Sequence, residues 1–106
     1  NLAKMADRGQ IKGGIVDGPL ALDNAISPQS AAIKGIQSPV AGQADILIAP
    51  DIETGNLLAK AITYFAGGKM ASVVVGARCP LVMPSRADPP ESKLISLALA
   101  IVIRGV

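Results

Sequence analysis

The stretch Ser85-Arg86-Ala87-Asp88 holds the side chains best suited to chemistry in this 106-residue chain. A guanidinium such as that of Arg86 can hold a phosphate group through two parallel hydrogen bonds. The neighbouring Ser85 hydroxyl can donate to an oxygen that gains negative charge during a reaction. In the structural alternative, Arg86 pairs with an acid and Asp88 only caps the helix that follows. The position of Asp88 favours the cap, whereas both alternatives stay open for Arg86.

Two further groups of polar and turn-forming residues directly follow apolar runs. The first group has the composition of a turn. In the second, a glycine predicts either a helix that begins late, with the next residue as its cap, or a backbone that a ligand approaches closely. An ordinary turn between a strand and a helix is the alternative for the second group. The residues are Asp17, Gly18 and Pro19 in the first group, and Asp51, Gly55 and Asn56 in the second.

The elements that must position these residues alternate along the chain. Polar caps and the spacing of apolar residues predict helices at 28–34, at about 56–65 and at 94–103, the last apolar almost all round. Alternating strands and helices predict an α/β layer with a mainly parallel sheet, where ligands bind at the carboxyl ends of strands. All three groups of candidate residues follow such ends. Short apolar runs predict the strands, at 13–17, 45–49, 73–77 and 81–83.

Composition excludes several classes of function. The net charge is +2, and the basic residues are scattered without aromatic neighbours, which argues against a nucleic-acid surface. The apolar run at 94–103 is far shorter than the roughly 20 residues of a membrane span. With no histidine and one cysteine, a metal site, an intrachain disulfide and a Ser–His–Asp triad are not expected. The single cysteine fits a reducing compartment and predicts a cytoplasmic protein.

Apolar residues make up 50% of the chain and charged residues 17%, which leaves few side chains to cover a wet surface. We therefore expect part of the apolar surface to face another chain, or a part of the same protein outside these residues. The chain begins with Asn1 and not with methionine, which also suggests a fragment.

Several ordered strings resemble the phosphate acetyl/butyryl transferase family, also called phosphotransacylases. No string is decisive alone, but the ordered set covers most of residues 13–103 and is specific. The first string and the S-R-A-D loop look more like the butyryl branch than the acetyl branch. The strings are V-D-G-P-L-A-L-D-N-A-I-S (16–27), S-P-V-A-G-Q-A-D-I-L-I-A-P-D-I-E-T-G-N (38–56), S-R-A-D (85–88) and K-L-I-S-L-A-L-A (93–100).

The resemblance implies reversible transfer of a short-chain acyl group, butyryl or similar, between coenzyme A and inorganic phosphate. It implies no metal, no tightly bound cofactor and no covalent acyl-enzyme. It also implies a three-layer α/β/α fold like that of isocitrate and isopropylmalate dehydrogenases, incomplete here, and a homodimer. Residues 1–84 would belong to the second α/β domain, and residues 85–106 to an interdomain loop and a helix that returns to the first domain. The chain alone is then expected to be inactive.

The resemblance also assigns roles to residues. Arg86 matches the family arginine that holds phosphate and charge, and Ser85 matches the serine that stabilises the intermediate. The acetyl branch has an aspartate seven residues after that serine, proposed as the base for the thiol. Here that position is Ser92, with Glu91 beside it, so the base does not transfer. The expected substrate-binding residues are Asp17, Gly18, Pro19, Asp51, Gly55, Asn56 and Asp88.

Two other functions compete with acyl transfer. One is a non-catalytic module of the same fold that binds coenzyme A or phosphate, or that regulates a fused enzyme. The other is a structural α/β fragment whose loops bind nothing by themselves. Ser85 and Arg86 are both present, which argues against complete loss of a site.

Overall fold

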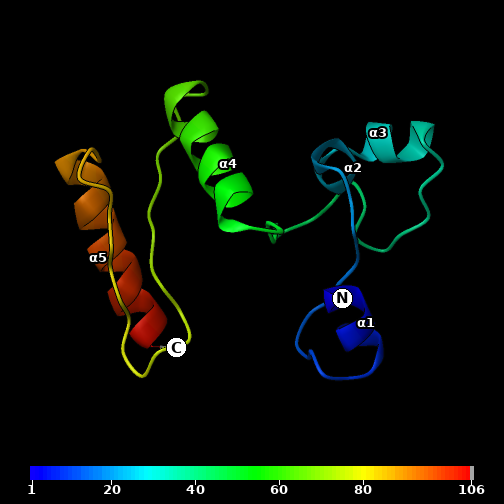
Figure 1. The fold of residues 1–106 in the computed structure, drawn as a ribbon, viewed down its shortest axis with the longest axis horizontal. Coiled ribbons are helices and arrows are strands. Elements are labelled where there is room, and N and C mark those ends of the chain that lie inside the picture. Colours follow the sequence, from blue (N-terminus) through cyan, green and yellow to red (C-terminus); the bar gives the residue numbers. More distant parts are fainter. Residues whose placement is uncertain (106) are drawn as a thin grey trace. The chain divides into compact units, whose positions relative to one another are not determined.

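A computed structural model describes residues 1–105, which lie in two compact units, Asn1–Ile48 and a second unit that begins at Ala49. The first unit holds three short helices and the second holds two longer ones (Figure 1). None of these helices is long and apolar enough to cross a membrane. The helices are α1 (Leu2–Asp7), α2 (Leu22–Ile26), α3 (Pro28–Ile33), α4 (Ile52–Tyr64) and α5 (Pro90–Arg104).

In the first unit, α2 packs against α3, and a loop closes over them. Ser27 caps α3, as expected, because its side chain accepts a hydrogen bond from the Ser30 backbone N–H at 3.2 Å. The loop is held by two backbone bonds to α2, including one from the Gly42 N–H to the Asn24 carbonyl at 2.7 Å. Gly42 has a φ of +81°, and a Cβ there would lie 2.6 Å from the Cα of Pro28. This glycine therefore allows the loop to lie directly on the helix pair.

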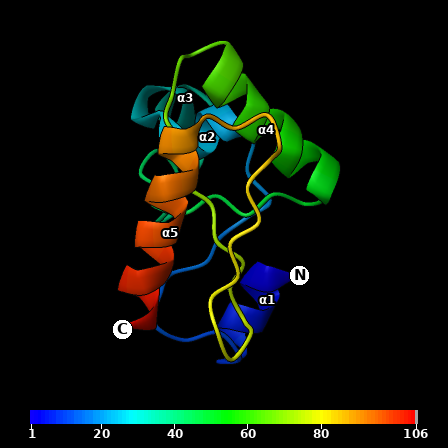
Figure 2. The same cartoon turned by 90° about the vertical axis from the view of Figure 1, so that its left-hand side faces the viewer.

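In the second unit, a long extended connection runs away from the end of α4, turns, and returns to the start of α5 (Figure 1). Its two arms meet at one antiparallel bridge, where the Val74 N–H donates to the Leu81 carbonyl at 2.8 Å. The connection is also tied to α5, because the Ser72 N–H donates to the buried Ser96 hydroxyl at 3.0 Å. Figure 2 shows the same connection beside α5 from a second direction.

The predicted strands are the main error of the sequence interpretation. Within residues 1–105, none of the segments 13–17, 45–49, 73–77 and 81–83 forms a strand, and the bridge between the last two is antiparallel and not parallel. A strand needs a neighbour for its N–H and C=O groups and cover for its apolar side chains. That cover is absent here: Ile46 is 78% exposed, and Ile48 and Val75 are each 71% exposed. These residues therefore do not form the expected three-layer α/β/α sandwich by themselves.

The last helix has an open apolar side. A helix that is apolar all round should lie between other elements, and the family resemblance implies that one of them is a domain outside these residues. In the structure α5 buries Ser96 and Ala100, whereas Leu94, Leu97, Ile101 and Val102 are exposed. Residues 1–105 thus cover one side of α5 and leave its other apolar side chains open.

Candidate functional site

Residues 85–88 form a small closed turn before α5. The Ser85 N–H donates to Asp88 Oδ2 at 2.9 Å, and the Asp88 N–H donates back to the Ser85 carbonyl at 3.1 Å. The Ser85 hydroxyl accepts from the Ala87 N–H at 3.3 Å. Arg86 lies at the tip of this turn and is exposed. The sequence therefore closes the turn through its first and last residues and leaves the guanidinium outside it.

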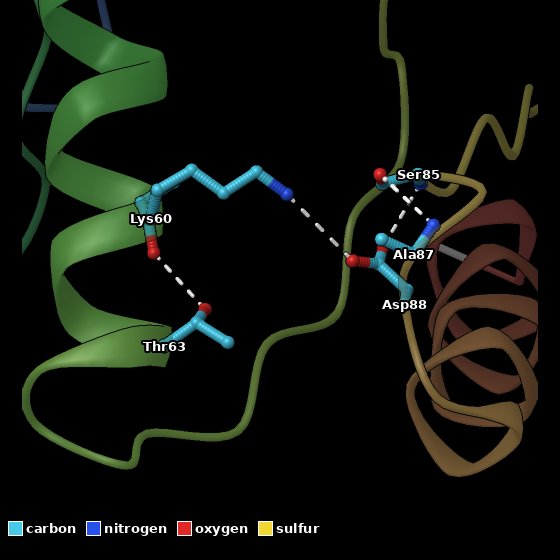
Figure 3. Close-up of polar contacts among 6 residues, drawn as sticks. Lys60, Thr63, Ser85, Ala87 and Asp88 are labelled. Carbon is cyan, nitrogen blue, oxygen red and sulfur yellow. Dashed lines mark hydrogen bonds and ion pairs between the residues drawn. The ribbon is translucent and has the colours of Figure 1, made fainter.

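A residue of α4 contacts the same turn. Lys60 extends from α4, and its Nζ lies 3.8 Å from Asp88 Oδ1 (Figure 3). Asp88 therefore uses both carboxylate oxygens, one for the Ser85 N–H and one for the lysine. Lys60 was not among the residues predicted from the sequence. No local signal marks it, because Lys60 and Asp88 are 28 positions apart and lie on either side of most of the connection between the two helices.

The prediction that Asp88 caps the following helix is wrong. The N-cap of α5 is Pro89, and no side chain makes a capping hydrogen bond there. The reason is that the Asp88 carboxylate turns back to the N–H of Ser85, where it closes the preceding turn. Asp88 instead supports the residues on which the chemistry was expected to rest.

The structural alternative for Arg86 was pairing with an acid. In the part of the chain that the structure describes, no ion pair includes Arg86. The acid nearest in sequence, Asp88, is engaged by Lys60 instead. Glu91, the carboxylate beside the open base position, forms an ion pair with Lys69 at 2.7 Å, which raises the pKa of Lys69. Among residues 1–105 the guanidinium of Arg86 is thus available to an anion.

Asp51 has a clear structural role at the start of α4. Its carboxylate accepts from the Thr54 N–H at 2.7 Å. The Thr54 hydroxyl, together with this N–H, holds the Asp51 pKa below its ordinary value. The helix begins at Ile52, so Gly55 lies in its first turn. The late start and the Asn56 cap predicted from Gly55 are therefore wrong, because the Asp51 cap starts the helix despite the glycine.

The first group of polar residues lies in the other unit. The Asp17 carboxylate accepts from the Gly18 N–H at 2.8 Å. The Ser38 hydroxyl, and next to it this N–H, hold the pKa of Asp17 below its ordinary value. Gly18 has a φ of +148° and joins Pro19 through a cis peptide bond. The predicted turn is thus present, with Ser38 joining it from the later loop.

The candidate residues fall into three separate places. Ser85, Arg86 and Asp88 share one turn, and α4 adds Lys60 to it. Asp51 caps the start of α4, and Gly55 and Asn56 follow in its first turns, so along the helix axis they lie about 14, 8 and 6 Å from Lys60. Asp17, Gly18 and Pro19 belong to the first unit.

Two surface hollows among the described residues are lined by residues other than these candidates. One hollow of about 220 Å³ lies between residues 73–80 and the end of α5, and another of about 530 Å³ lies between residues 13–15 and 39–46. Within residues 1–105, no group of three or more His, Cys, Asp or Glu side chains is placed to hold a metal ion. The candidate site that the structure supports is therefore an exposed turn with an anion-binding side chain.

Comparison with known proteins finds a family whose sequence pattern this chain matches. A family model described as "Phosphate acetyl/butaryl transferase" matches residues 1–101. The chain is 61% identical over 99 residues to a phosphate acetyltransferase of Rickettsia typhi, covering 93% of this chain and 28% of that protein. It is 59% identical over 100 residues to a probable phosphate butyryltransferase of Bacillus subtilis, covering 94% of this chain and 33% of that protein. Acetyl and butyryl relatives thus match about equally well.

A solved structure is also similar. The backbone matches a branched-chain phosphotransacylase from Enterococcus faecalis V583 with a TM-score of 0.80 and 41% sequence identity. The match covers 94% of this chain and 38% of that one. The chain therefore spans about a third of the length of the curated relatives and of the solved structure that it matches.

Proposed function

The chain belongs to the phosphate acetyl/butyryl transferase family, and from this membership we propose that it supplies part of the site of an acyltransferase. The reaction is the transfer of a short-chain acyl group, butyryl or similar, between coenzyme A and inorganic phosphate. The observation that carries the proposal is the closed turn 85–88, which presents Arg86 outward with no ion partner among the described residues.

The chemistry requires one bond to form and one to break. In the direction that consumes acyl phosphate, the thiol sulfur of coenzyme A attacks the acyl carbonyl, and a carbon–sulfur bond forms. The carbon–oxygen bond to phosphate then breaks, and the thiol proton is balanced by the protonation of the released phosphate. Negative charge gathers on the carbonyl oxygen and on the leaving phosphate, which are the groups that a hydroxyl and a guanidinium stabilise best.

Three residues of the turn have proposed tasks. Arg86 holds the phosphate through charge-assisted hydrogen bonds, and its exposed place at the tip of the turn suits this task. Ser85 donates its hydroxyl proton toward the developing oxyanion, which is compatible with the same oxygen accepting the Ala87 N–H. Asp88 keeps the turn closed and so fixes the spacing between these two side chains.

The second and third groups of candidates remain proposed substrate contacts. Asp51, Gly55 and Asn56 lie at the start and in the first turns of α4, where the positive end of the helix dipole favours an anionic ligand. Asp17, Gly18 and Pro19 form a turn in the first unit. We assign both groups to the binding of coenzyme A or phosphate, in line with the family resemblance.

The exposed apolar side chains bear on the wider fold and the partners. We propose that residues 1–84 join a larger α/β domain, and that residues 85–106 cross to another domain that covers the open side of α5. The exposure of Leu94, Leu97 and Ile101 supports this arrangement, as does the short span of the chain relative to its relatives. The segments predicted as strands would then gain the neighbours that they lack here. Pairing into a homodimer stays a prediction.

The test compares two proteins in one assay. The 106-residue chain and a version with the length of its relatives are each mixed with butyryl-CoA or acetyl-CoA, and thiol release is followed with and without inorganic phosphate. We expect phosphate-dependent release from the long version and none from the short chain. A long version that binds coenzyme A but turns over no acyl-CoA would replace the proposal with a non-catalytic binding module.

A further inference from the structure

The ion pair between Lys60 and Asp88 involves an acid that also closes the turn 85–88. Lys4 also pairs with an aspartate, Asp7, at 3.7 Å, but both side chains lie in one short helix and are 67% exposed. Lys60 and Asp88 come from different parts of the second unit, and their side chains are 40% and 28% exposed. Partial burial reduces the screening of this pair by solvent and salt.

The pair acts on the turn that carries Ser85 and Arg86. Asp88 Oδ2 accepts the Ser85 N–H at 2.9 Å, while Asp88 Oδ1 faces Lys60 Nζ at 3.8 Å (Figure 3). The carboxylate is therefore held from both sides, by the turn and by α4. Lys60 also lies 6.0 Å from the centre of the Tyr64 ring, which favours the same placement of its ammonium group.

Without Lys60, the Asp88 carboxylate would harm an anion site in two ways. It is the acid nearest in sequence to Arg86, two residues away, so it would compete with phosphate for the guanidinium. Its negative charge would also repel an incoming dianion. A lysine that binds the carboxylate from the α4 side opposes both effects.

We propose that Lys60 is a positioning residue for phosphate binding: it holds Asp88 toward α4, neutralises its charge and leaves Arg86 to the phosphate. This inference rests on the proposed function, and it names a residue outside the loop that the sequence identified. Lys60 acts through Asp88 and does not itself touch the substrate.

The first experiment measures phosphate saturation in a version of the protein with the length of its relatives. Lys60→Met removes the charge and keeps much of the side-chain length. We expect it to raise the KM for phosphate about three- to tenfold, with kcat within about twofold of the unchanged protein, since an exposed or half-exposed ion pair contributes modestly. Lys60→Arg keeps the charge and should restore the KM. Lys4→Met removes a lysine from an aspartate pair far from the turn in sequence and should change neither constant.

A double substitution separates positioning from direct contact. In Asp88→Asn the carboxylate charge is gone, so adding Lys60→Met should change the KM for phosphate no further. An equal rise in both backgrounds would show that Lys60 binds phosphate itself and would overturn the proposal. An unchanged KM in Lys60→Met alone would overturn it as well.

A second readout does not depend on turnover. Lys60→Met should loosen the Asp88 carboxylate and so speed hydrogen exchange at the Ser85 amide, which Asp88 holds. Lys60→Arg should leave that rate near its original value. If the unchanged protein shows no acyl transfer, the proposed function fails, and the exchange rate alone then decides whether Lys60 positions the turn. An unchanged hydrogen-exchange rate at the Ser85 amide in Lys60→Met would overturn the proposal that Lys60 positions Asp88.

Discussion

Three carboxylates, those of Asp17, Asp51 and Asp88, each accept a backbone N–H from a residue no more than three positions away. Each therefore has a local structural task that is independent of any ligand. Arg86 differs from them, because no ion pair in residues 1–105 includes it. Among the candidates, the Arg86 guanidinium is therefore the group best suited to bind a ligand. The three carboxylates instead organise the turns in which the other candidates lie.

Residue types and local spacing identified the turn 85–88 but assigned the wrong partner to Asp88. The choice between capping a following helix and closing a preceding turn depends on a few backbone angles, which the sequence does not specify at that point. Asp51 shows the same ambiguity in reverse, since its cap was overlooked in favour of Asn56. The role of Lys60 could not be predicted from the sequence, because its contact with Asp88 depends on how two segments that are distant in the chain pack together.

The Asp51 cap predicts a pH-dependent contribution to stability. The hydrogen bonds from Thr54 lower the Asp51 pKa in the folded protein below its ordinary value of 3.8. The stabilisation is therefore present above that ordinary pKa and is lost as the pH falls through the lower folded pKa. We expect Asp51→Ala to lower the melting temperature at pH 7, and the difference from the unchanged protein to shrink as the pH falls below about 4.

Asp51→Asn is the matched control for this prediction. Asparagine caps helices about as well as aspartate but does not titrate. Its melting temperature should lie closer to that of the unchanged protein at pH 7. A pH-independent deficit in Asp51→Ala would contradict the assignment of the effect to the carboxylate.

At the scale of elements, the presence of α3, α4 and α5 followed from local signals, whereas the strands did not form. The cap at Ser27 with Pro28 gave the start of α3, and the spacing of Leu58, Ala61 and Ile62 gave α4. Such signals lie within one or two turns of chain, so a sequence displays them directly. A strand instead depends on partners elsewhere in the sequence. Within the described residues those partners are missing, and the four apolar runs stay unpaired apart from one bridge.

The contact between α5 and the extended connection is the clearest link inside the second unit. Ser96 is 2% exposed, and its hydroxyl donates to the Ser92 carbonyl at 2.8 Å while it accepts the Ser72 N–H at 3.0 Å. Ser96→Ala would leave that N–H without its partner. We expect a loss of about 1–3 kcal/mol in the free energy of unfolding, measured by denaturant titration of the version with the length of its relatives.

Thr63→Val serves as the comparison for Ser96→Ala. The Thr63 hydroxyl donates to the Ala59 carbonyl at 3.0 Å inside its own helix, so its removal leaves no backbone N–H unpaired. Its cost should stay within about 0.5 kcal/mol. Equal losses in the two variants would mean that the bond between Ser72 and Ser96 does not hold the connection to α5.

At the scale of the whole molecule, the low charge and the exposed apolar side chains agree with the family comparison. A backbone that matches a solved phosphotransacylase at a TM-score of 0.80, yet covers 38% of it, has the path of a segment within a larger protein. Among the described residues the buried apolar side chains are those of Ala25, Ala31 and Ala100, which are too few and too small to form a core. The ordered strings in the sequence predicted the family, whereas composition alone predicted only that something must cover the apolar surface.

The most direct test of the proposed function is phosphate saturation of the acyl-transfer reaction in the version with the length of its relatives, comparing Arg86→Ala with the unchanged protein. Hydrogen bonds to a charged group contribute about 1.5–3 kcal/mol, so the KM for phosphate should rise at least about tenfold. Arg78→Ala removes another exposed arginine of the same unit and should stay within about twofold. An Arg86→Ala protein with the phosphate dependence of the unchanged protein would remove Arg86, and with it the turn 85–88, from the site.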